Sequence, residues 1–168
     1  MPHQAAADTF TFFLQGGVGG PVNEDSTDSA GFETAFQLGF TVASRGDIEV
    51  GGRAGRVDFA SGDQLGPFAA PTLDYLTLGG DYQFNEGFYQ SGIFIGLGYY
   101  SLEGDVLTDL EGTSEKRDET GIGVALGLTG EFEITPKVGF AVDVIGHVTE
   151  LEAQDLFVTV NAGIAFHF

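Results

Sequence analysis

The sequence predicts an all-β protein, an eight-stranded antiparallel up-and-down transmembrane β-barrel. Apolar residues recur at every second position in eight separate runs, and this is the side-chain period of a β-strand. The positions between them hold mainly glycine, threonine, acids and amides, so one face of each run suits lipid and the other suits a polar interior. The 27 glycines also disfavour helices, because glycine loses the most backbone entropy on folding.

The first four runs cover 9–22, 33–42, 48–55 and 75–84. Each places large apolar side chains on one face. These residues are Phe10, Phe12, Leu14 and Val18 in the first run, Phe36, Leu38, Phe40 and Val42 in the second, Ile48, Val50 and Ala54 in the third, and Leu76, Leu78, Tyr82 and Phe84 in the fourth. A strand with one apolar face is the unit that a lipid-facing barrel requires.

The last four runs cover 92–100, 121–134, 138–149 and 156–168. Their apolar faces hold Ile93, Ile95 and Leu97, then Ile122, Val124, Leu126 and Leu128, then Val138, Phe140, Val142 and Val144, and finally Val158, Val160, Ile164 and Phe166. Short turns at 44–47, 85–87 and 135–137 alternate with longer loops at 23–29, 61–71, 103–119 and 150–155. This order puts all short turns, and both termini, at one end of the barrel.

Length, composition and charge narrow the function. The 168 residues are enough for one domain, which we expect to span 9–168 after a tail at 1–8 left by signal cleavage. There is no cysteine, so thiolate metal sites and disulfides are excluded. A net charge of −19 with 6 Lys plus Arg argues against nucleic-acid binding, which needs basic contacts with phosphates.

The run 156–168 ends on Phe168 and carries Val160, Ala162, Ile164 and Phe166 on its apolar face. It resembles the C-terminal insertion strand of bacterial outer-membrane barrels. Over 9–168 the chain is similar to the small eight-stranded outer-membrane barrels of the OmpA-like and opacity-protein type. This resemblance implies a place in the bacterial outer membrane, contact with its lipids and lipopolysaccharide, assembly by the outer-membrane insertion machinery, and a monomer.

Charged residues on the inward faces form the candidate site. Arg53, Asp81, Glu131 and Asp143 all point into the predicted lumen, where an unpaired guanidinium is costly. We therefore expect Arg53 to pair with one or two of these carboxylates. His147 lies on the same inner face and is expected to form hydrogen bonds there.

Acidic side chains gather in the long loops, and their default interpretation is solvated surface charge. They are Glu24, Asp25 and Asp28 in the first loop, Asp105, Asp109 and Glu111 in the third, and Glu150, Glu152 and Asp155 in the fourth. The alternative is weak binding of Ca²⁺ or Mg²⁺, since hard cations take oxygen ligands. The spacing does not match an EF-hand, so no defined metal site is assigned.

The main functional hypothesis is a barrel with a plugged polar lumen that has a structural or surface-interaction role through its acidic loops. The alternative is a narrow cation-preferring channel, favoured by the acidic inner face and opposed by the narrow interior of an eight-stranded barrel. A lipid-modifying enzyme ranks third. His147, Thr149 and Glu150 are similar to the His-x-Ser arrangement of lipid A deacylases, but Thr149 is expected inside or at the rim rather than facing lipid. No catalytic residue and no cofactor are therefore assigned.

Overall fold

The computed structural model describes residues 10–22, 31–45, 47–60, 64–84, 88–107 and 114–168. The tail expected at 1–8 lies outside these residues. Among the residues described, no helix is long and apolar enough to cross a membrane. The strands are β1 (Thr11–Pro21), β2 (Glu33–Arg45), β3 (Ile48–Asp58), β4 (Gln64–Leu65), β5 (Phe68–Gln83), β6 (Tyr89–Leu107), β7 (Ser114–Thr135), β8 (Val138–Thr149) and β9 (Leu156–His167).

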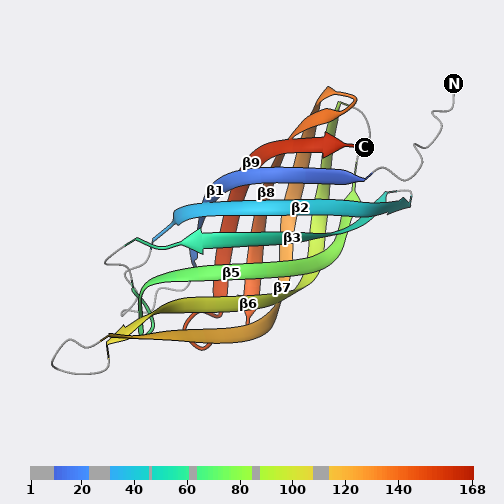
Figure 1. The fold of residues 1–168 in the computed structure, drawn as a ribbon. Helices are drawn as coiled ribbons and strands as arrows, with labels where there is room; N and C mark the ends of the chain where they lie inside the picture. Colours follow the sequence, from blue (N-terminus) through green and yellow to red (C-terminus); the bar gives the residue numbers. More distant parts are fainter. Residues whose placement is uncertain (1–9, 23–30, 46, 61–63, 85–87, 108–113) are drawn as a thin grey trace, which may run out of the picture.

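The predicted barrel is confirmed. Eight long strands pair with their neighbours in the order β3-β2-β1-β9-β8-β7-β6-β5, and a further pairing between β3 and β5 closes the ring (Figure 1). All pairings are antiparallel, including that between the first and last strands, where Thr11 faces His167. Closure removes free sheet edges around the barrel wall, which a span through lipid requires. β1 begins and β9 ends at the end of the barrel with the short turns, called here the short-turn end. The opposite end is the long-loop end.

The alternation divides the side chains between the two faces of the wall. Outward apolar residues stay exposed on an isolated barrel, and Leu78, Leu97 and Leu128 each expose 60% or more of their surface. Inward polar residues are buried, among them Gln37 and Asn161. On β7 the outward apolar residues extend from Ile122 to Ile134, enough to cross the hydrocarbon core of a bilayer with a tilted strand.

Inward glycines make room for the aromatic rings that fill the lumen. A Cβ at Gly39 would lie 1.9 Å from the Phe13 ring, and one at Gly55 would lie 2.2 Å from the Tyr75 ring. An alanine at either position would force the ring or the backbone to move. Glycine at these two inward positions therefore lets an aromatic ring pack directly against the backbone of the wall.

Two of the predicted loops are largely strand. The expected loop 103–119 instead extends β6 and β7, whose ladder continues without a register shift to Leu107 and Ser114. Apart from Val106 and Leu107 this extension holds polar residues and one glycine, so the alternation that marks strands elsewhere is absent from its sequence. The expected loop 61–71 contains a tight hairpin in which Leu65 pairs with Phe68. Gly66 has a φ of +53° there, a conformation that glycine adopts at little cost.

Candidate functional site: the lumen and the long-loop end

The middle of the lumen holds a buried ion pair. Arg53 on β3 donates from Nη2 to both carboxylate oxygens of Asp81 on β5, at 3.1 and 3.2 Å. The side chains are only 6% and 12% exposed. The Arg53 guanidinium carbon also lies 3.7 Å from the centroid of the Phe94 ring, a cation–π contact. The Phe13 ring lies near the same carbon, at 5.4 Å, so the charge of Arg53 is shared between one carboxylate and two aromatic rings.

Asp143 lies among amides rather than beside Arg53. Its Oδ2 accepts a hydrogen bond from Gln37 Nε2 at 2.7 Å, and its Oδ1 accepts one from Asn161 Nδ2 at 3.1 Å. Gln37 also donates to Gln15 at 2.7 Å and accepts from the Tyr75 hydroxyl at 2.8 Å. These bonds join β1, β2, β5, β8 and β9 across the lumen into one polar network.

The network includes residues that the sequence analysis did not single out. Gln15 and Gln37 are direct cross-strand partners, as are Asp143 and Asn161. Their signal was present, since each is a polar residue at an inward position. The sequence alone does not show which inward residues lie at the same level of the barrel. The strand register determines this.

Glu131 occupies a different layer, near the short-turn end. It hydrogen-bonds His167 Nε2 at 2.6 Å, and His167 Nδ1 contacts the Thr11 hydroxyl at 3.1 Å. Both Glu131 and His167 are about a fifth exposed. Of the four predicted lumen charges, the structure therefore brings only Arg53 and Asp81 into direct contact.

The half of the lumen toward the long-loop end is apolar and aromatic, which the sequence analysis did not anticipate. His147 is 1% exposed, stacks on Phe157 at 4.3 Å, and contacts the hydroxyls of Tyr100 and Thr159 at 3.2 Å each. Tyr75 packs against the same rings. The interior of an eight-stranded barrel is just wide enough for side chains to fill.

The connections at this end fold into the mouth. Leu65 and Phe68 from the β4–β5 hairpin, together with Leu151 after β8, are 0–5% exposed in one cluster with the aromatic layer. Glu119 on β7 secures the β8–β9 connection by accepting hydrogen bonds from the backbone N–H groups of Glu152 and Ala153. Side chains from these two connections therefore pack in one buried cluster with the aromatic layer.

The structure describes only some of the acidic loop residues that the sequence analysis named. Glu24, Asp25, Asp28, Asp109 and Glu111 lie outside the described residues. Within the described residues, no group of three or more His, Cys, Asp or Glu side chains is arranged to hold a metal ion. The outward apolar residues form a band around the wall, called here the apolar belt. Beyond this belt, exposed charged side chains form pairs, such as Lys116 with Glu103. That hydrogen bond raises the pKa of the Lys116 ammonium.

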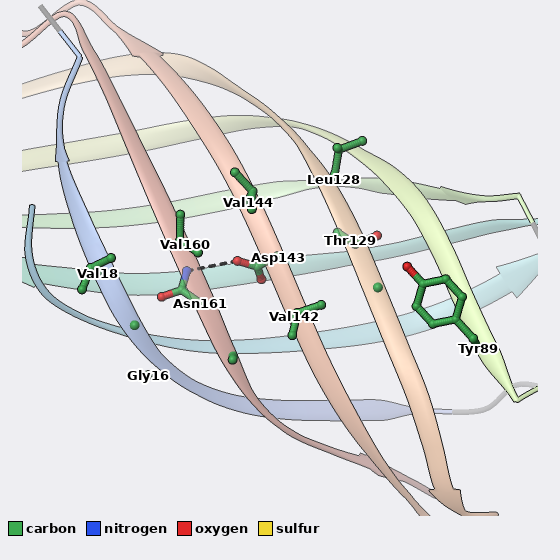
Figure 2. A pocket seen from close by; sticks show the side chains of 13 residues that line it. Gly16, Val18, Tyr89, Leu128, Thr129, Val142, Asp143, Val144, Val160 and Asn161 are labelled. Atoms are coloured by element: carbon green, nitrogen blue, oxygen red, sulfur yellow. Dashed lines mark hydrogen bonds between the residues drawn. The ribbon is translucent and has the colours of Figure 1, made fainter.

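A pocket of about 350 Å³ lies on the outer wall, across β1, β9, β8 and β7 (Figure 2). Its exposed lining side chains, including Val18, Leu128 and Val144, are outward residues of the apolar face. The small residues Gly16 and Ala162 form part of its floor. The buried, inward residues Asp143 and Asn161 also line this pocket (Figure 2).

No protein-family model matches the sequence. No curated protein matches it either. Solved structures share the fold at low sequence identity. Neisserial surface protein A matches with a TM-score of 0.64 and 15% identity, over 95% of this chain and 97% of that one. Ail, the attachment invasion locus protein of Yersinia pestis, matches with a TM-score of 0.62 and 16% identity, over 97% and 100%. Outer membrane protein OprG of Pseudomonas aeruginosa matches with a TM-score of 0.66 and 17% identity, over 96% of each chain. In fold, this chain is therefore an eight-stranded transmembrane β-barrel like those of bacterial outer-membrane proteins.

Proposed function

We propose that this chain is a monomeric, non-conducting barrel of the bacterial outer membrane that acts at the cell surface through its long-loop end. The observation that carries this proposal is the burial of large side chains inside the barrel toward the long-loop end. Tyr75, Tyr100, Phe157 and Leu151 are each 4% exposed or less, and they fill the barrel toward the long-loop end. A protein whose interior is filled in this way offers its outer surfaces, rather than a passage, for function.

The membrane assignment rests on the exterior and on the fold. A wall on which Leu78, Leu97 and Leu128 remain exposed would aggregate in water, whereas it is stable against lipid. The structures that share the fold include proteins named for the outer membrane and for the cell surface. In such barrels the short turns face the periplasm, so the long-loop end would face the exterior. Outer-membrane lipids, lipopolysaccharide and the insertion machinery are the expected partners of the wall.

A surface-interaction role agrees with the name of one structural neighbour, the attachment invasion locus protein. The extension of β6 and β7 lies beyond the apolar belt and carries exposed charges, Lys116 and Asp118 among them. Weak binding of divalent cations at the acidic loops would bridge such a surface to the phosphates of lipopolysaccharide. Calorimetric titration with Ca²⁺ or Mg²⁺ tests this part, and the absence of heat with both ions would remove it.

Planar-bilayer conductance of the refolded chain tests the closed lumen. We expect a silent bilayer from the wild type. The double variant Tyr75→Ala/Tyr100→Ala removes two rings from the plug and serves as the positive control, with folding checked by heat-modifiable gel mobility. Steady openings from the folded wild type would refute the proposal.

The second candidate is a narrow cation-preferring channel. It is favoured by two acids toward the short-turn end of the lumen, Glu131 and Glu49, the latter lying opposite Asp81 in the β3–β5 ladder. Cation-selective openings that are lost in Glu131→Gln would establish it.

The proposal contains no catalytic step. His147 and Thr149 are 1% and 8% exposed, and the Thr149 hydroxyl donates to the Gln154 carbonyl at 2.7 Å, so neither side chain faces lipid. Product formation from labelled lipids would contradict this part of the proposal.

A further inference from the structure

One edge of β7 has no strand partner where it extends past the barrel. The β6–β7 ladder continues to Leu107 and Ser114, but β8 pairs with β7 only as far as Gly123 and Thr149. One more contact follows, because Ile122 O accepts from Glu150 N at 2.9 Å. In the described part of the chain, no strand covers the far edge of β7 over 114–120. Figure 1 shows this end of β6 and β7 projecting beyond the neighbouring strands.

The direction of each backbone group along this edge follows from two hydrogen bonds. Glu133 N donates to Phe88 O on the β6 side, whereas Ile122 O accepts on the β8 side. Backbone groups alternate in direction along a strand, and the β6–β7 ladder has no register shift. The even-numbered residues Lys116, Asp118 and Thr120 therefore direct their N–H and C=O groups away from β6, toward the open edge. Such a row of unpaired groups is a template for an added strand.

The side chains along this edge are accessible and carry an excess of negative charge. Glu115, Lys116, Arg117 and Asp118 are all exposed. Lys116 is paired with Glu103, and Arg117 with Glu115 at 3.3 Å, so both cations are already neutralised within the hairpin. Asp118 has no cation partner among the described residues. An added strand would therefore meet a carboxylate, and opposite charges on directly paired strands are stabilising.

We propose that the β7 edge over 114–120 binds an extended segment of another protein by strand addition, with one Lys or Arg of that segment opposite Asp118. The backbone groups of Lys116, Asp118 and Thr120 supply affinity, and Asp118 selects a basic residue. The charges on the edge disfavour the neutral apolar strands that would otherwise aggregate there. This inference rests on the proposed function in one respect, that the long-loop end faces the cell exterior.

Amide hydrogen exchange by NMR on the full chain in lipid nanodiscs tests the proposal. The probe is a synthetic peptide of Thr residues with a single Lys at its centre, which strand addition places opposite Asp118. We expect the peptide to protect the amides of Lys116, Asp118 and Thr120, which face the open edge. The odd-numbered amides point to β6 and are protected without it. The matched control is the same peptide methylated at alternate backbone nitrogens, because it keeps the charge and loses the hydrogen bonds.

Two variants separate the backbone from the charge. Asp118→Ala removes only the carboxylate, whereas Asp118→Pro also removes an N–H that faces the open edge and is not used in the β6 ladder. Proline is tolerated on edge strands in this orientation. We expect affinity for the peptide to fall in both variants and to fall further in Asp118→Pro, by about threefold to tenfold for the lost hydrogen bond.

Three results would overturn the proposal: no binding of the peptide, equal binding of the methylated peptide, or protection of the even-numbered amides by a second copy of the chain without peptide. None of them bears on the closed lumen, which the conductance measurement tests separately. A silent bilayer together with an unoccupied β7 edge would retain the surface barrel and discard only this partner.

Discussion

The buried pair of Arg53 and Asp81 predicts a large loss of stability when the cation is removed. Arg53→Met keeps most of the side-chain volume but leaves the Asp81 carboxylate, which is 12% exposed in the pair, without its partner. Breaking a buried ion pair from one side costs about 3–5 kcal/mol, because an uncompensated charge stays buried. The variant also loses the contact with the Phe94 ring, for which about 1–2 kcal/mol is typical at a desolvated site. We therefore expect the free energy of unfolding to fall by at least about 3 kcal/mol.

The chain contains a matched control three residues further along β3. Arg56 forms a similar pair with Asp74, at 2.7 Å, but on the outer wall, where the side chains are 55% and 43% exposed. Solvent screens such a pair, so Arg56→Met should change the unfolding free energy by only about 0–1 kcal/mol. Both variants remove the same chemical group from the same strand and differ in burial.

Reversible urea unfolding of the barrel in lipid vesicles, followed by fluorescence and gel mobility, measures these differences. The double variant Arg53→Met/Asp81→Asn should be more stable than Arg53→Met alone, because it no longer buries an unpaired charge. An Arg53→Met barrel as stable as the Arg56→Met barrel would refute the assignment of Arg53 and Asp81 as the stabilising pair of the lumen.

The remaining predictions concern packing and the connections at the long-loop end. Gly39→Ala places a Cβ 1.9 Å from the facing phenylalanine ring and should cost about 1–3 kcal/mol, whereas Gly16→Ala, with nothing within 4 Å, should leave urea unfolding nearly unchanged. Leu151→Ala removes a side chain that is 2% exposed, so a loss of about 2–5 kcal/mol is expected; an unchanged midpoint would mean that the mouth is not packed. Glu119→Ala should speed hydrogen exchange at the backbone amides of Glu152 and Ala153, and equal rates in the two proteins would contradict the contact.

Much of the fold was predictable because a barrel wall has a simple rule. Lipid outside and side chains inside impose alternation at every position, and runs such as 121–134 follow it almost without interruption. The rule fails where neither environment is present. The extension of β6 to Leu107 and of β7 from Ser114 carries mostly polar residues, although Val106 packs against the core cluster at the mouth. No apolar alternation marks it, so it was predicted as a loop.

The candidate site was less predictable, because its contacts depend on register. An inward position is visible in the sequence, but the level of Arg53 relative to Asp81 and Glu131 depends on how the strands are staggered. In the structure, the stagger of the strands places Asp81 beside Arg53 and Glu131 beside His167. Gln15 and Gln37 are uncharged polar residues at inward positions, like many others in the sequence. Only the strand register shows that they are direct partners.

By itself, the sequence determined the strand period, the number of long strands and the face of the wall that meets lipid. These follow from composition at alternate positions, which local chemistry specifies residue by residue. The tertiary structure alone decided which inward charges meet, that the long-loop half of the lumen is apolar, and that one edge of β7 stays open. Each of these depends on which segments, distant in the chain, come to lie at one level, and that is set by barrel closure and stagger rather than by any single strand.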